Sequence, residues 1–379
     1  MQYCKNNHTK YLTFCKTLVK WGSQQLYRRF MTEIAEGIYF DMPESEYHNA
    51  EGLSCSGMKI LRVSPYHYWW ESSMNPARPE RDDDSAAKTW GKAFHKIMLE
   101  PQRFDDCYAA SFEAGEGLLK TVDDMKEFCL ANEIPTKGLK KKDDWQKAIL
   151  EAVPNAPFYE LEKEKYLAAN IGKEFLSSEG LQKLKTMSYM ATLSPNVKKI
   201  LDNAVCEVSI FVKDPETGIM LKARMDAIKP NATLDLKTFS NQRGKPIQEA
   251  ARDAISGYFY NFQYVVYSYI RKVASRKIAS GEIVVPDDKK YLFADIEPAF
   301  AFILTESDAP HYTYVIEMRS GMDGAAGNLY FSNAWEGFRK YVNLYKDCLD
   351  KYGKGAWLLE SDYEVLEDEK IPNIMYQTY

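Results

Sequence analysis

The stretch Arg224-Met-Asp-Ala-Ile-Lys-Pro-Asn-Ala-Thr-Leu-Asp-Leu-Lys-Thr238 places Asp226 on one predicted strand and Asp235 and Lys237 on the next. Asp235 and Lys237 are two residues apart, so on a strand they project from the same face. A carboxylate and an ammonium at this spacing can share one phosphate, because the carboxylate can hold Mg²⁺ while the ammonium contacts the phosphate or the attacking water. An Asp-x-Lys pattern alone is also typical of a solvated strand, so the neighbouring sequence decides between these interpretations.

Two further residues give this stretch a context. Glu207 lies on the preceding predicted strand, and His95 lies on an earlier predicted helix. Three acids that converge on a strand pair need a cation, because like charges cannot crowd together without one. His95 has apolar neighbours, so by itself it is typical of a buried core histidine. Beside the acids it would complete a metal site as a nitrogen ligand.

The hydrophobic pattern around these residues predicts a mixed sheet flanked by helices, a fold of the α/β class. The pattern predicts a short strand and turn over 37–50, a helix capped by Ser54 or Ser56, and a helix over about 86–100 that ends at Pro101. Beyond a turn at 214–218, the remaining predicted strands and helices are 205–213, 219–228, 233–239, about 246–275, 299–305, 311–318 and 325–350. A Lys-rich helical insertion is expected over about 114–200.

Charge and composition limit the class of protein. The chain has 379 residues, 49 Lys and Arg against 54 Asp and Glu, and a net charge of −5. This negative net charge argues against a histone-like partner of DNA, but it does not exclude binding of nucleic acid in a local basic cleft. Residues 1–30 carry Lys and Arg but no acid, and we interpret them as a basic extension outside the fold, either a flexible arm or the result of a start codon assigned too early. Residues 31–379 are expected to form the functional domain.

The cysteines and the apolar runs predict a cytoplasmic protein. The seven cysteines are an odd number without a Cys-x-x-Cys pair, which is typical of reduced cytosolic thiols. No apolar run approaches the roughly 20 residues of a membrane helix, and the N-terminus lacks a secretory signal pattern. A phosphate-binding P-loop and a Gly-x-Ser-x-Gly elbow are also absent from the sequence.

The chain resembles the exodeoxyribonuclease VIII (RecE-type) group of PD-(D/E)XK nucleases, encoded mainly by phages and prophages. The resemblance covers about residues 33–355. It rests on a series of motifs that occur in order: Gly37-Ile-Tyr-Phe-Asp41, Ser54-Cys-Ser-Gly-Met-Lys-Ile-Leu61, Gly91-Lys-Ala-Phe-His95, Cys206-Glu-Val-Ser-Ile-Phe211, Arg224-Met-Asp226, Leu234-Asp-Leu-Lys-Thr238 and Gln263-Tyr-Val-Val-Tyr267. The fold that this implies is a restriction-endonuclease-like core with a helical insertion.

The resemblance also implies a role for each matching position. Metal would be bound by His95, Asp226, Asp235 and the carbonyl of Leu236, and Glu207 would help to hold a second ion. Lys237 matches the catalytic lysine. The residues expected to contact DNA or to orient the site are Gln263, Tyr267, Arg224 and Thr238. Gln263 and Tyr267 lie one helical turn apart, which is equally typical of a packing pair on a core helix.

The activity implied is that of a Mg²⁺-dependent exonuclease, with two ions in the site and Mn²⁺ as a possible substitute. It would degrade linear double-stranded DNA from the 5′ end and leave 3′ tails for recombination. The implied partners are duplex DNA, a single-strand annealing recombinase and further copies of the chain in a ring, inside a bacterial host cell. An iron–sulfur cluster is not expected, because only Cys348 follows Cys206. Two alternatives stay open: a DNA-binding module that does not cut, and an endonuclease or branched-DNA nuclease on the same fold.

Overall fold

A mixed sheet of seven strands forms the centre of the first of two structural units. The computed structural model describes residues 34–78, 86–295, 297–319 and 329–358. The first unit combines the residues up to 82 with those from 194 onward, and the second contains residues 83–193. The basic extension expected over 1–30 lies outside the described residues.

The order of the strands in the sheet is β1-β5-β6-β7-β8-β9, and β2 pairs with β6 beside this path. Strands β7 and β8 are parallel, whereas β5, β6 and β7 form antiparallel pairs, so the predicted mixed sheet is confirmed. The strands are β1 (Gly37–Tyr39), β2 (Leu53–Ser54), β5 (Val205–Lys213), β6 (Met220–Lys229), β7 (Ala232–Phe239), β8 (Ala299–Glu306) and β9 (Thr313–Met318).

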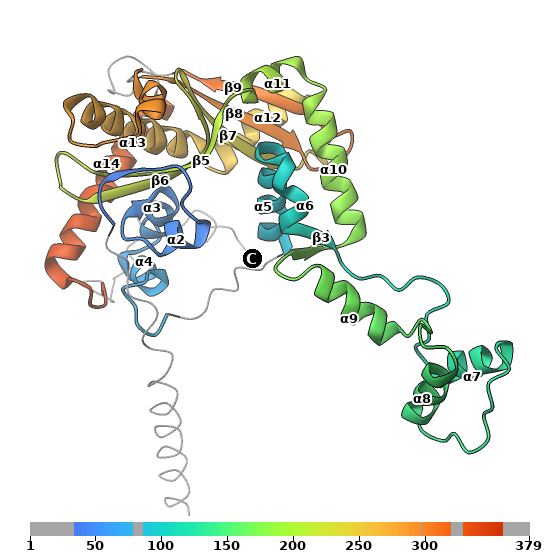
Figure 1. The fold of residues 1–379 in the computed structure, drawn as a ribbon. Helices are drawn as coiled ribbons and strands as arrows, with labels where there is room; N and C mark the ends of the chain where they lie inside the picture. The colour runs from blue at the N-terminus through green and yellow to red at the C-terminus, as the bar shows by residue number, and fades with distance from the viewer. Residues whose placement is uncertain (1–33, 79–85, 296, 320–328, 359–379) are drawn as a thin grey trace, which may run out of the picture. The chain divides into compact units, whose positions relative to one another are not determined.

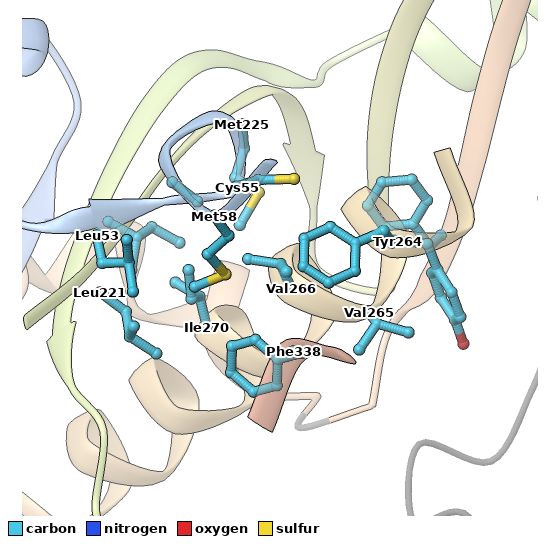
Figure 2. Packing of buried hydrophobic residues seen from close by; sticks show 14 of the residues in the cluster. Leu53, Cys55, Met58, Leu221, Met225, Tyr264, Val265, Val266, Ile270 and Phe338 are labelled. Atoms are coloured by element: carbon cyan, nitrogen blue, oxygen red, sulfur yellow. The ribbon is translucent and has the colours of Figure 1, made fainter. Parts of the chain in front are cut away.

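Helix α13 is the main helix on this sheet, and it packs against β5, β6, α3 and α14 (Figure 1). The core between them is apolar: Met58 from α3, Leu221 and Met225 from β6, Ile270 from α13 and Phe338 from α14 meet in Figure 2. The helices of the first unit are α2 (Glu44–Asn49), α3 (Cys55–Leu61), α4 (Pro65–Glu71), α11 (Pro195–Leu201), α12 (Ile247–Gly257), α13 (Tyr260–Ser280), η2 (Asp287–Phe293) and α14 (Leu329–Tyr352).

The turn between β5 and β6 is held by Asp214. Its carboxylate accepts hydrogen bonds from the Thr217 backbone N–H (3.1 Å) and from the Tyr269 hydroxyl on α13 (2.6 Å). Arg339 on α14 lies 2.9 Å from the same carboxylate. Gly218 completes the turn with a φ of 71°, which glycine adopts without strain. The turn predicted over 214–218 therefore also ties the sheet to two helices.

Two sequence predictions about the first unit are wrong in detail. The segment 44–49 is the helix α2 rather than part of a turn. The single helix expected over about 246–275 is two helices, because Phe259 between α12 and α13 adopts a left-handed φ of 55°. The helix at Ser54 is confirmed: its hydroxyl accepts the N–H of Gly57 at 3.1 Å and caps α3.

The second unit consists mainly of helices, with one small two-stranded sheet. Its elements are α5 (Ala86–Leu99), η1 (Pro101–Arg103), α6 (Phe104–Cys107), β3 (Tyr108–Ala110), α7 (Val122–Ala131), α8 (Lys142–Ala152), α9 (Tyr159–Ala169), β4 (Glu174–Leu176) and α10 (Ser178–Thr192). Helices α7 and α8 share a separate apolar cluster that includes Met125, Trp145 and Ile149. In the part of the chain that the structure describes, no helix combines the length and apolar character needed to cross a bilayer.

Candidate active site

Asp226 and Asp235 lie at neighbouring positions of strands β6 and β7. Ala227 pairs with Leu234 across the antiparallel ladder, so the next position along the two strands brings Asp226 opposite Asp235. The backbone N–H of Leu236 donates a hydrogen bond of 2.7 Å to Oδ2 of Asp226. The carboxylate of Asp226 thus reaches across to β7 and is oriented by its backbone.

The carboxylate of Asp235 is 1% exposed and is held from two sides. The Lys237 ammonium forms an ion pair with its Oδ1. The Gln263 side chain on α13 donates a hydrogen bond of 2.5 Å to its Oδ2. Both neighbours are hydrogen-bond donors to the carboxylate, and such contacts favour its charged form. The structure therefore brings together Asp226, Asp235, Lys237 and Gln263, four of the predicted site residues.

Electrostatics sets the protonation states of this group. Burial raises the pKa of Asp226, although nearby Lys237 opposes this effect. Burial alone would lower the pKa of Lys237, but Asp235 and Asp226 outweigh it and raise that pKa above the ordinary value. Lys237 is consequently an ammonium at neutral pH. It is 18% exposed and can approach a bound anion.

Glu207 occupies the position on β5 opposite Asp226, since Cys206 pairs with Ala227 and Val208 with Met225. The Glu207 backbone has a φ of 57°, which costs about 1–3 kcal/mol for a residue other than glycine. Backbone strain of this kind clusters at functional sites. The Glu207 carboxylate lies 2.6 Å from Nε of Arg224.

Arg224 is held by the protein at its other nitrogens. Its Nη1 donates to the Met42 carbonyl at 2.8 Å and to the Ser209 hydroxyl at 3.0 Å. Thr238, the other candidate for DNA contact on this sheet, is half-buried and pairs in register with Thr305 on β8. Contact of Arg224 or Thr238 with DNA stays a prediction.

The face of α13 that points to β6 and β7 carries Gln263, Tyr267 and Arg271 at intervals of four residues. Burial, with added effects from neighbouring Tyr47 and Asp235, raises the pKa of Tyr267 well above its usual value, so its hydroxyl stays protonated. Arg271 is fully buried and donates to the carbonyls of Lys229 (2.5 Å) and Ala232 (2.6 Å). It therefore fixes the turn between the two strands that carry the aspartates.

Sequence reasoning missed two residues of this region. Arg271 continues the four-residue spacing after Gln263 and Tyr267, and that spacing was the available signal. The ring of Tyr260 lies 5.3 Å from the Lys237 ammonium. Its burial raises its pKa to about 12. Nothing in the sequence near Tyr260 indicates this contact.

His95 lies on α5, in the second structural unit. Asp226 and Asp235 belong to the first unit, and the role of His95 as a metal ligand stays a prediction. Its side chain is half-buried on a helix whose neighbouring residues Ala93 and Phe94 are buried.

The aspartate pair fits a hard divalent cation such as Mg²⁺. Carboxylate and carbonyl oxygens are the ligands that Mg²⁺ prefers, and Asp226, Asp235 and the Leu236 carbonyl belong to this class. Burial disfavours the charged form of Asp226, and a bound cation would remove that penalty. Among the described residues, three or more His, Cys, Asp or Glu side chains do not gather into a ready metal cluster. Binding of a metal ion by the aspartate pair therefore stays a prediction.

A family model matches the part of the chain that carries the candidate site. The family model of the PD-(D/E)XK nuclease superfamily matches residues 52–302, about two thirds of the chain. A crystal structure of a "putative exonuclease" from Eubacterium rectale has 15% sequence identity and a TM-score of 0.38, and the match covers 89% of this chain and 98% of that one. No curated protein sequence matches the chain.

Proposed function

Because the chain belongs to the PD-(D/E)XK nuclease superfamily, we propose that it is a Mg²⁺-dependent exonuclease that degrades linear duplex DNA from the 5′ end and leaves 3′ single-stranded tails. The observation that carries this proposal is the joint placement of Asp226, Asp235 and Lys237 on β6 and β7. The resemblance of the motif series to that of RecE-type nucleases supports this polarity and a role in recombination.

The metal ion would be held by Asp226, Asp235 and the Leu236 carbonyl, with Glu207 and His95 as candidates for completing a two-ion site. When bound, Mg²⁺ supplies charge stabilisation at the phosphate and a lower pKa for its water, and Mn²⁺ can supply the same chemistry. Glu207 is the candidate whose placement the sheet explains, because its position on β5 is opposite Asp226.

The residues of the chain itself have distinct tasks in this proposal. Lys237 carries a fixed positive charge beside Asp235 and neutralises the charge that develops on the phosphate during cleavage. Gln263 holds the Asp235 carboxylate in one orientation through its 2.5 Å hydrogen bond. Arg271 acts further away, because it fixes the β6–β7 turn and so the register of the two aspartates.

The proposed partners follow from the resemblance rather than from the site. They are a single-strand annealing recombinase and further copies of the chain in a ring, in the cytoplasm of a bacterial cell that carries a phage or prophage. Light scattering from the purified protein tests the ring, because a monomer in the presence and absence of DNA would contradict it.

The activity is tested with linear and covalently closed circular duplexes of the same sequence, in Mg²⁺, with the linear form labelled at either the 5′ or the 3′ end. We expect loss of the linear form only, with early release of the 5′ label. Cleavage of both forms would favour an endonuclease. Binding of both forms without cleavage would favour a DNA-binding module.

A further inference from the structure

The turn between α12 and α13 exposes two aromatic side chains next to the candidate active site. Tyr258 is 58% exposed and Phe259 is 47% exposed, so both rings are accessible to a ligand. Phe259 adopts a φ of 55°, a conformation that is unfavourable for a bulky residue. This strained turn holds both rings at the surface, and backbone strain of this kind clusters at functional sites.

Cations from helix α3 and its C-cap lie beside these rings. The Arg62 guanidinium lies 4.7 Å from the centre of the Phe259 ring. The Lys59 ammonium donates a hydrogen bond of 2.9 Å to the Tyr258 carbonyl. Arg62 is exposed and Lys59 is half-buried, so the end of α3 and the turn together form one surface. We call Lys59, Arg62, Tyr258 and Phe259 the aromatic platform.

The platform is continuous with the candidate active site. The ring of Tyr258 stacks on the ring of Tyr260, with 5.6 Å between their centres. The Lys237 ammonium lies 5.3 Å from the centre of the Tyr260 ring and also forms the ion pair with Asp235. Tyr260 also stacks on the buried Phe302 of β8, at 5.3 Å, which anchors the rings to the sheet.

Proteins that bind single-stranded nucleic acid combine aromatic rings with neighbouring cations. Unpaired bases stack on aromatic rings without regard to sequence, and Lys and Arg contact the phosphates between them. Bases within a duplex already stack on one another and offer no exposed face. The platform therefore suits an unpaired segment of DNA better than a paired one.

We propose that Tyr258 and Phe259 stack the unpaired terminal bases of the DNA strand that is cut at Lys237, while Lys59 and Arg62 contact its phosphates. The inference rests on the proposed nuclease function and narrows its substrate to ends that are frayed or already single-stranded. A blunt duplex would have to open its terminal pairs before it could use this surface.

Binding is measured with an end-labelled DNA that carries 2-aminopurine in an unpaired terminal segment, in Ca²⁺ in place of Mg²⁺ to limit cutting. The parent protein should quench the fluorescence of the probe, because stacking quenches this base. Tyr258→Ala and Phe259→Asn should lose most of the quenching and weaken affinity for the probe by about tenfold each. Asn is chosen at position 259 because it tolerates a positive φ.

Three controls separate stacking from folding. Tyr258→Phe and Phe259→Tyr keep a ring and should retain the quenching. Tyr291→Ala removes a 50% exposed tyrosine on η2 and should bind as the parent does. Thermal melts should show that all five variants fold.

The outcomes distinguish this inference from the proposed function. If the parent cuts DNA but both ring-deleted variants quench and bind as it does, the platform is not a binding site and the nuclease proposal stands. Equal affinity of the parent for the unpaired segment and for a blunt duplex would also overturn the inference. If the parent cuts no DNA in Mg²⁺ but still quenches the probe, the nuclease proposal fails while the platform stands as a site for unpaired bases.

Discussion

The side-chain nitrogen of Gln263 lies 2.5 Å from Oδ2 of Asp235, and this contact joins the first turn of α13 to the strand that carries the candidate catalytic pair. The contact bridges 28 residues of sequence and lies in a buried position. Asp235 is thus held by Lys237 on its own strand and by Gln263 on the covering helix. Gln263 acts through Asp235, so we regard it as a positioning residue.

Replacing Gln263 by Ala should slow cleavage by about tenfold to a hundredfold, because the Asp235 carboxylate loses one of the groups that orient it. The Mg²⁺ concentration for half-maximal rate should rise as well. Single-turnover cleavage across a Mg²⁺ titration measures both. Gln263→Glu, which places a second carboxylate against Asp235, should be slower still. Parental rates in the Ala variant would show that Gln263 only packs.

His95 is a predicted metal ligand that lies on helix α5 and not on the sheet that carries the aspartates. If it binds the metal, His95→Ala should raise the Mg²⁺ or Mn²⁺ concentration required for cleavage, whereas His48→Ala on the exposed face of α2 should not. Titration of each variant with Mn²⁺, followed both by cleavage and by calorimetry without DNA, makes the comparison. Unchanged metal affinity in His95→Ala would assign this residue to the core of its own unit.

The Asp214–Arg339 pair gives the fold a pH dependence. Burial would raise the pKa of Asp214, but Arg339, Thr217 and Tyr269 outweigh it and lower that pKa below its ordinary value. A carboxyl group with a lowered pKa in the folded state stabilises the fold above its unfolded pKa of about 3.9. This contribution is lost as the pH falls through the lower folded pKa. We therefore expect the free energy of unfolding to fall below about pH 4.

Asp214→Asn should cost about 2 kcal/mol at pH 7, because it removes the buried carboxylate that pairs with Arg339 and accepts from Tyr269, although Arg339 keeps its ion pair with the exposed Glu216. The loss of stability between pH 4 and pH 2 should be smaller in this variant than in the parent. Asp253→Asn, which breaks an exposed pair with Lys245, serves as the control and should change stability by less than about 1 kcal/mol. Urea denaturation at several pH values provides the free energies, and equal acid sensitivity in parent and Asp214→Asn would contradict the assignment.

Arg271 supports the site from a distance. Arg271→Lys keeps the charge but cannot reproduce the planar fork that reaches the Lys229, Ala232 and Leu292 carbonyls. We expect a loss of about 2 kcal/mol or more from buried acceptors left without donors. Arg276→Lys, at an exposed position of the same helix, should be nearly neutral. Equal stability of the two variants in urea denaturation would show that the hydrogen bonds from Arg271 do not stabilise the β6–β7 turn.

Much of the fold could be predicted because its signals are local. The alternation of apolar residues and the turn Asp214–Gly218 locate β5, β6 and β7 to within about a residue of their observed ends. The break between α12 and α13 could not be predicted, because Phe259 has no intrinsic preference for a positive φ and adopts it only in its tertiary setting. The same holds for the left-handed backbone at Glu207.

The candidate site also contains residues that local sequence patterns predict and contacts that only the tertiary fold creates. Asp235 and Lys237 could be predicted to share a face from their spacing alone, and Asp226 from its place on the neighbouring strand. The four-residue spacing places Arg271 on the same helix face as Gln263, but its contact with the Leu292 carbonyl and the contact of Tyr260 with Lys237 join residues far apart in sequence, so no local pattern reveals these contacts. The pairing of Glu207 with Arg224 also depends on the register between β5 and β6, which the turn sets.

The proposed cutting group consists of Lys237, Asp226 and Asp235, and Lys237→Ala separates cleavage from DNA binding. Its single-turnover cleavage of linear duplex in Mg²⁺ is compared with its equilibrium DNA affinity in Ca²⁺, beside Asp235→Asn and the parent. Removing one preorganised charge at the reacting phosphate should lower the rate by at least about a hundredfold. DNA affinity should stay nearly unchanged, because many phosphate contacts share it. Cleavage by a folded Lys237→Ala protein at the parental rate would overturn the catalytic role proposed for this lysine and its two neighbouring aspartates.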